Sequence, residues 1–169
     1  STAPVDLHFY RVPDTEAPKI IYDTKGSYTT RFRFGVQDKV LRISERPDSR
    51  RPERTQVSVY YNSLDRIAIA DAVATFDSTL VATVLDLTVG GMAEVKAPMA
   101  VKDLKLDITG KSRVTLTGSA RYLTLFISSG VLEAAALEVM SAVSNVTSSG
   151  TASLWVTARF EGKTSTGGK

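Results

Sequence analysis

Apolar residues alternate with polar ones over much of the chain, which predicts an all-β protein. The alternation is clearest in three apolar triplets, with polar residues between them that would face solvent. The triplets are Leu85, Leu87 and Val89; Leu104, Leu106 and Ile108; and Leu123, Leu125 and Ile127. Because successive side chains of a strand point to opposite faces, each triplet would line one side of a buried core.

Glycines recur near these triplets at an almost constant spacing. Their steps are 19, 20 and 20 residues (110 − 91, 130 − 110 and 150 − 130), at Gly91, Gly110, Gly130 and Gly150. When the repeats are aligned on these glycines, Ala134 falls in register with Val114. Asp71 stands twenty residues before Gly91, and we expect it to occupy the preceding corner, because Asp tolerates positive φ. A fixed period of this size indicates a solenoid whose coils bury their apolar faces against one another, with glycine at the corners.

Strand–corner–strand units of this length predict a single-stranded parallel β-helix of about five coils, with right-handed winding favoured. We expect the repeats over residues 64–169 and an N-terminal β-strand capping region over residues 1–63, together forming one structural domain. Short alternating strands are expected in this region around residues 7–12, 20–23, 28–34, 40–43 and 57–61. They would cover one end of the solenoid, which otherwise exposes unpaired strand edges.

One segment also fits a helix. The run from Leu132 to Met140 consists of strong helix formers, and its apolar spacing matches 3.6 residues as well as 2. We favour a strand there, because neighbouring coils outweigh local propensity. The glycine- and threonine-rich residues 161–169 would form either a further corner or a frayed tail.

Composition describes an ordinary soluble globular protein, with 169 residues, 43% hydrophobic and 23% charged. A net charge of +3, from 21 cationic and 18 anionic side chains, is a weak excess, and we expect no nucleic-acid partner. The absence of cysteine excludes disulfides and thiolate metal sites. No apolar stretch reaches the ~18 residues of a membrane span. Since the sequence starts at Ser1 without methionine, we expect an export signal to have been removed.

The residues available for catalysis are few, and we expect no cofactor and no metal site. His8 is the only histidine, and no nucleophile elbow accompanies it. Asp103 and Asp107 could serve acid–base chemistry, as in the carbohydrate-active enzymes that share the β-helix. Four residues apart on a strand, however, they would be separated by ~13 Å, too far for a hydrolase pair. We therefore expect a non-enzymatic protein, with the β-helix enzyme as the alternative.

Two sets of residues are candidate binding sites. Phe126 and Trp155 fall on outward positions between inward apolar residues, where an aromatic ring could bind a sugar or a partner protein. Alternatively, these rings could cover an end of the solenoid or fill a contact between subunits. In the second case the protein would be a self-associating homo-oligomer. Arg50, Arg51 and Arg54 lie in a loop that could bind anions, although neighbouring acidic residues nearly balance their charge.

The repeats resemble a known bacterial family. The motifs Leu104-x-Leu106-x-Ile108-x-Gly110 and Leu123-x-Leu125-x-Ile127-Ser128-Ser129-Gly130, after the segments 57–61 and 64–67, are similar to the "putative auto-transporter adhesin, head GIN domain". The similarity runs from about Leu7 to the end of the chain. It implies an exported β-helical domain of the periplasm or cell surface, with a role in adhesion to a glycan or protein surface. It supplies no catalytic residues.

Overall fold

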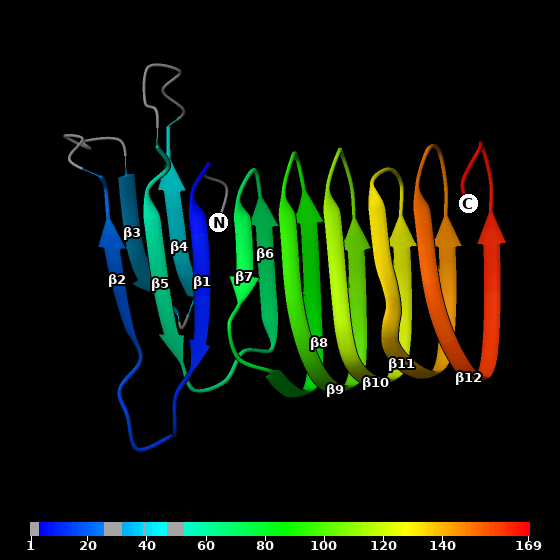
Figure 1. The fold of residues 1–169 in the computed structure, drawn as a ribbon, viewed down its shortest axis with the longest axis horizontal. Helices are drawn as coiled ribbons and strands as arrows, with labels where there is room; N and C mark the ends of the chain where they lie inside the picture. The colour runs from blue at the N-terminus through cyan, green and yellow to red at the C-terminus, as the bar shows by residue number, and fades with distance from the viewer. Residues whose placement is uncertain (1–3, 26–31, 39, 47–52) are drawn as a thin grey trace.

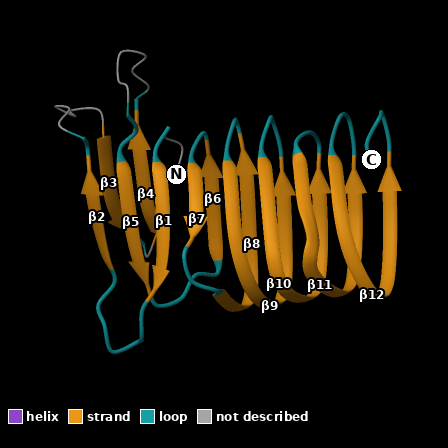
Figure 2. Cartoon of the chain, in the orientation of Figure 1, coloured by secondary structure: helices purple, strands orange, loops and turns teal. Residues whose placement is uncertain are grey.

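The computed structural model describes residues 4–25, 32–38, 40–46 and 53–169, and the regular structure in them is entirely β-strand (Figure 2). The strands are β1 (Asp6–Arg11), β2 (Lys19–Asp23), β3 (Phe32–Gln37), β4 (Val40–Glu45), β5 (Gln56–Tyr61), β6 (Arg66–Ala70), β7 (Val73–Phe76), β8 (Leu80–Gly90), β9 (Glu94–Ile108), β10 (Arg113–Ile127), β11 (Val131–Val146) and β12 (Thr151–Thr164).

The long strands stack as the coils of a parallel β-solenoid of about five turns, which confirms the predicted fold. Each of β9 to β12 runs along one wall of a flattened tube, bends, and returns along the opposite wall (Figure 1). We call these the first wall, which includes β5, β1, β7 and residues 94–101, and the second wall, which includes β6 and residues 103–108. In Figure 1 the first wall is nearer and runs downward while the coils advance to the right, so the winding is right-handed.

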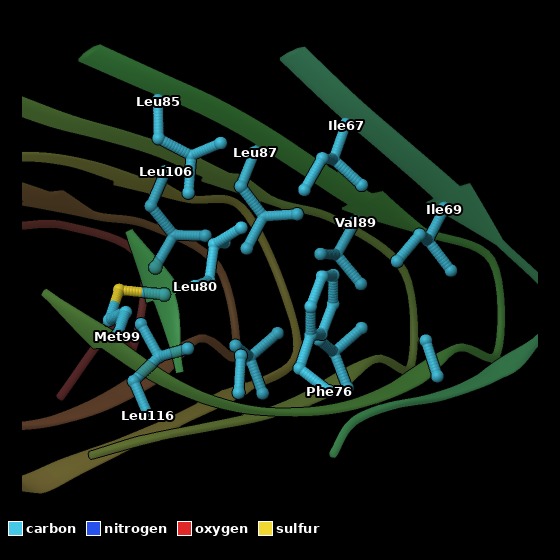
Figure 3. Close-up of a cluster of buried hydrophobic side chains, with 14 of the residues drawn as sticks. Ile67, Ile69, Phe76, Leu80, Leu85, Leu87, Val89, Met99, Leu106 and Leu116 are labelled. Carbon is cyan, nitrogen blue, oxygen red and sulfur yellow. The ribbon is translucent and has the colours of Figure 1, made fainter. Parts of the chain in front are cut away.

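The space between the walls is filled by rows of apolar side chains in register. Leu87 pairs with Leu106, and Leu106 with Leu125, so that leucine stacks on leucine along the solenoid axis. All three are at most 1% exposed, and full burial of such a side chain contributes roughly 1.5–3 kcal/mol. Figure 3 shows Leu106 and Leu87 beside Phe76 and Met99, which come from the opposite wall. The three apolar triplets of the sequence therefore point inward, as predicted.

The corners require positive φ, and the sequence supplies it in different ways. Gly91 and Gly110 have φ of 65° and 68°, and Asp71 takes the same conformation at 57°, as predicted. The Asp71 carboxylate also accepts a hydrogen bond of 2.9 Å from the backbone N–H of Met92. The corner before β12 differs from the prediction, because its positive φ of 54° belongs to Ser148 and not to Gly150.

The predicted register between β10 and β11 is wrong by two residues at its start. Val114 pairs with Leu132, not with Ala134, because the corner between these strands is one residue shorter than the one before it and Gly130 stands one residue later within it. A register shift between Thr115 and Thr117 restores the later pairing, so that Ile127 faces Val146. A bulge thus compensates for the short corner, and the apolar rows stay aligned.

The alanine-rich segment is strand, as the repeat predicted, and not helix. It forms the middle of β11, which pairs with β10 on one side and β12 on the other. The C-terminal residues form a further corner. The N–H of Lys169 donates to the Gly150 carbonyl at 2.9 Å, and the N–H of Ala152 donates to the Lys169 carbonyl at 2.8 Å. Stacking on the previous coil therefore holds this segment.

The N-terminal residues form strands that join the solenoid. β1 lies between β5 and β7 and is parallel to both, whereas β2 pairs with β5 antiparallel. β3 and β4 form a separate antiparallel hairpin. The predicted strand around residues 28–34 lies within the described residues only from Phe32 onward. The division between capping region and repeats at residues 63 and 64 stays a prediction.

The last coil leaves part of the core uncovered. Leu154 and Val156 point inward on β12 but are only partly buried, and Phe160 is 56% exposed. The Phe160 ring folds across the adjacent Gly162, where an added Cβ would lie 2.5 Å from the ring. Phe160 thereby covers part of the solenoid end, and Gly162 provides the room for its ring.

The buried Tyr61 hydroxyl makes stability sensitive to alkaline pH. Burial raises the pKa of Tyr61, and the nearby Arg11 lowers it in part. Because the folded chain then holds the phenolic proton more tightly than the unfolded chain, the stabilisation is complete below about pH 10 and is lost as pH rises through the folded pKa. We expect the free energy of unfolding to fall less steeply above about pH 10 in Tyr61→Phe, measured by urea denaturation. The exposed Tyr22→Phe is the control, and equal slopes in wild type and Tyr61→Phe would contradict the prediction.

Candidate binding surfaces

The outer face of β10 carries two exposed aromatic rings. Tyr122 and Phe126 point outward on the second wall, and they are 41% and 43% exposed. The residues that alternate with them, Leu123, Leu125 and Ile127, are buried in the core. Because side chains four residues apart on a strand share a face, the two rings stand ~13 Å apart along one flat surface.

Polar side chains flank both rings on the neighbouring strands. On β9, Asp103 is paired with Tyr122, and Asp107 with Phe126. On β11 the corresponding partners are Ser141 and Asn145. The surface formed by these residues with Lys105, Thr124 and Val143 is called the β10 face below. It combines apolar ring surface with carboxylate, amide and hydroxyl groups that form hydrogen bonds.

The rings of the β10 face are open to ligands to different degrees. The Arg121 guanidinium carbon lies 5.6 Å from the Tyr122 ring centre, a distance at which a cation interacts with the ring. Among the described residues, no other ring lies against Phe126. Phe126 therefore presents the more accessible ring.

The residues predicted as binding sites do not gather in one place. Trp155 is exposed, as predicted, at 49%, but it lies on β12 opposite Glu138, on the first wall. Phe126 lies on the second wall, on the other side of the core. Arg54 is far from both along the sheet, two residues before β5, where its guanidinium is 3.7 Å from the Asp6 carboxylate. Arg50 and Arg51 lie outside the described residues.

A second aromatic cluster, which no sequence pattern indicated, occurs on the first wall. Tyr10 and Tyr60 are paired across β1 and β5, and their rings stack with centres 5.0 Å apart. The Lys19 ammonium lies 4.8 Å from the Tyr60 ring centre on the other side. His8 is 3.0 Å from the Asp77 carboxylate. Since these rings cover one another's faces, the cluster stabilises the wall and presents ring edges to solvent.

A groove of about 1030 Å³ opens on the second wall between β4 and β6. Its apolar lining includes Phe9 and Val59 from the first wall, Ile43 from β4, and Ile67 and Ile69 from β6. Arg42 and Arg66 line it as well. No sequence pattern indicated the groove, because it depends on which strands lie side by side.

The described residues contain no cluster of three or more histidine, aspartate or glutamate side chains able to hold a metal ion. Asp103 and Asp107 lie four residues apart on the same face of β9, which separates their side chains by ~13 Å. The 4–25, 32–38, 40–46 and 53–169 segments also include no helix that is long and apolar enough to cross a membrane.

Comparisons with known proteins identify relatives at the level of family and fold. A family model described as "Putative auto-transporter adhesin, head GIN domain" matches residues 11–169. None of the curated proteins matches the chain. A "putative adhesin" from Bacteroides fragilis NCTC 9343 has a similar structure, with a TM-score of 0.76 at 16% identity over 97% of this chain and 88% of that one.

Two structures from Parabacteroides distasonis ATCC 8503 are also similar. One, a "putative lipid binding protein", has a TM-score of 0.65 at 11% identity over 97% of this chain and 89% of that one. The other, a "putative adhesin", has a TM-score of 0.62 at 17% identity over 98% and 89%. At these identities the likeness shows a shared fold.

Proposed function

This chain belongs to the family of the "putative auto-transporter adhesin, head GIN domain", and from that premise we propose that it is a non-enzymatic binding module that recognises an extended glycan through the β10 face. The two exposed rings on one flat wall, flanked by carboxylates, carry this proposal. An adhesin acts outside the cytoplasm, so we place the module in the periplasm or at the cell surface.

The rings of the β10 face suit the apolar side of a sugar. Tyr122 and Phe126 keep over two fifths of their surface exposed, although burial of large apolar side chains is favourable. Large exposed apolar surface of this kind is typical of interaction sites. The rings project from a sheet whose inner face is fixed by the core, so they lose little freedom on binding a ligand.

The polar partners suit the hydroxyl groups of a sugar. Asp103 and Asp107 accept hydrogen bonds, and Asn145 both donates and accepts them. They stand beside the rings in register, so that one sugar could stack on a ring and bond to its neighbours. A protein partner would favour a continuous apolar centre, whereas here Thr124 separates the two rings and the β9 side of the face is charged, with Asp103, Lys105 and Asp107.

Loss of either ring is expected to weaken glycan binding. A glycan array identifies the tightest extended oligosaccharide, and calorimetry then measures its Kd. We expect Phe126→Ala and Tyr122→Ala each to raise this Kd about tenfold, the effect of losing about 1.4 kcal/mol of contact. Val84→Ala is the matched control, since Val84 is exposed on the same wall in the same row as Tyr122.

Trp155→Ala separates the two walls in the same measurement. If Trp155→Ala abolished binding while Phe126→Ala did not, the site would lie on the first wall and the β10 face would be excluded. An array without any bound glycan would reject glycan recognition itself. Release of reducing ends from the bound oligosaccharide would favour the carbohydrate-active enzyme, and we expect none.

A further inference from the structure

Each ring of the β10 face lies in a row of outward side chains that crosses the second wall from β9 to β12. Both rows hold, in the same order, a carboxylate, an aromatic ring, a hydrogen-bonding side chain and a cation. One row is Asp103, Tyr122, Ser141 and Arg159, and the other is Asp107, Phe126, Asn145 and Lys163. The charges around the two rings are therefore the same in sign and in position.

The row between them lacks a ring and has the opposite polarity. It runs from Lys105 on β9 through Thr124 and Val143 to Glu161 on β12. The Glu161 carboxylate also lies 2.8 Å from the Arg159 guanidinium, its neighbour along β12. Neither β9 nor β12 thus carries a single sign of charge, and the order from carboxylate to cation belongs to the rows that contain the rings.

The row of Phe126 is open to a charged ligand at both ends. Across the described ranges of the chain, neither Asp107 nor Lys163 takes part in an ion pair. The Tyr122 ring, by contrast, already has the Arg121 guanidinium carbon 5.6 Å from its centre. The Phe126 row is therefore the place where the charge of a ligand should matter most.

The lengths of the charged side chains match their distances from the Phe126 ring. Asp107 is short and stands on the strand adjacent to the ring, about 4.8 Å away. Lys163 stands two strands away, about 9.6 Å, but its flexible side chain is long enough to pass over the shorter Asn145. Both charges can thus reach a sugar that lies on the Phe126 ring, from opposite sides.

We propose that the glycan recognised by the β10 face is zwitterionic, with an amine directed toward β9 and an acid group directed toward β12. The inference rests on the proposed function and adds the chemical class of the ligand. The amine and the acid group would form charge-assisted hydrogen bonds with Asp107 and Lys163. Since the Tyr122 row has the same polarity, one extended glycan with a regular repeat would meet both rings in the same way.

The same charges disfavour the other classes of glycan. A polyanionic chain would bring its acid groups close to Asp103 and Asp107, and a polycationic chain would bring its amines close to Arg159 and Lys163. Like charges at such contacts are unfavourable and give specificity against the wrong ligand. A neutral chain would avoid this repulsion but would gain no ion pair from the four side chains.

Four synthetic hexamers built on the chitosan chain of β-linked glucosamine test the class of ligand. Carboxymethylation of the primary hydroxyl adds an acid group at the edge of each sugar opposite its amine, and acetylation removes the charge of the amine. The hexamers thus carry both groups, the amine alone, the acid alone or neither. Calorimetry at about pH 6, where the amine is protonated and the acid is ionised, should give a Kd for the zwitterionic hexamer at least about tenfold lower than for the other three. A zwitterionic hexamer with phosphate in place of carboxymethyl identifies the acid, which is the one that binds more tightly.

Two single variants assign the charges of the ligand to the Phe126 row. Asp107→Asn should raise the Kd of the zwitterionic hexamer about tenfold and abolish the preference for the free amine. Lys163→Gln should raise it by a similar factor and abolish the preference for the acid group. The matched controls, Glu138→Gln and Lys111→Gln, change exposed residues of the same charge away from the β10 face. Equal Kd ratios in each variant and its control would overturn the inference.

The outcomes separate the charge of the ligand from glycan recognition itself. If the neutral hexamer bound as tightly as the zwitterionic one and Phe126→Ala weakened both, glycan binding by the β10 face would stand and a zwitterionic ligand would be rejected. If the zwitterionic hexamer did not bind at all, the inference would be overturned, and the glycan array would decide the proposed function separately.

Discussion

Gly118→Ala is expected to lower the free energy of unfolding by about 3 kcal/mol or more. Gly118 lies within β10 with φ of 101°, a conformation that residues with a Cβ rarely adopt. An added Cβ would also lie 2.1 Å from the carbonyl oxygen of Met99 on the neighbouring coil. Since that oxygen belongs to the backbone, β9 and β10 would have to separate. Thermal denaturation should show a Tm lower by roughly 6–12 °C.

Gly35→Ala is the matched control. Gly35 lies in β3, and no atom lies within 4 Å of the position that its Cβ would take. We expect its Tm to stay within about 2 °C of the wild-type value, since surface substitutions usually change stability by less than 0.5 kcal/mol. A Gly118→Ala protein as stable as Gly35→Ala would show that β10 does not approach β9 as described.

Leu106→Ala is expected to have the next largest effect, a loss of about 2–5 kcal/mol. Leu106 has no exposed surface and is stacked between Leu87 and Leu125. Removal of its side chain leaves a cavity that Leu87 and Leu125 on the adjacent coils cannot fill, because backbone pairing holds both in register. Urea denaturation, followed by circular dichroism, measures this loss.

Lys105→Ala is the control for the same strand. Lys105 is the adjacent residue of β9, and its side chain points outward. Its replacement should change the free energy of unfolding by less than about 0.5 kcal/mol. If both variants lost similar stability, residues 104–108 would not alternate between core and solvent, and the assigned inward face would be incorrect.

The sequence was sufficient to predict the solenoid because its information is repeated. Each inward position, such as Leu106, has an apolar equivalent one coil earlier and one coil later, so a single ambiguous segment does not change the pattern. The alanine-rich segment of β11 illustrates this. Its local preference was helical, but β11 pairs with β10 and β12 at Leu132 and Glu133 before the alanines and again from Glu138 onward. The register shifts within the segment itself, and the pairing on either side of it decides the conformation.

Glycine spacing was a less reliable guide than apolar spacing. The corner before β11 is shorter than the previous one, and Gly130 does not occupy the same place in it as Gly110 does in its own corner. The bulge opposite Leu116 then restores the residue lost at the corner. At the next corner Ser148 adopts positive φ in place of Gly150. Corners can vary in length, whereas a shift of a strand by one residue would move its apolar side chains from the core to solvent.

The candidate site could be predicted only in part. The alternation indicated that Phe126 faces outward, and the same alternation would have identified Tyr122, four residues earlier. Asp103 and Asp107 became their neighbours only through the register of β9 with β10. The groove could not be predicted, since nothing in the composition of β1 indicates that it enters between β5 and β7.

The position of β1 also has a consequence for the order of folding. Asp6 pairs with Gln56 and with Val73, whereas residues in β9 and β10 pair with partners one coil away. Contacts between residues distant in sequence form slowly, because a long loop must close first. When the full chain refolds from denaturant, the pairing of β1 therefore requires longer loops to close than the pairing of β9 to β12, and those coils are expected to acquire protection from hydrogen exchange before β1 does.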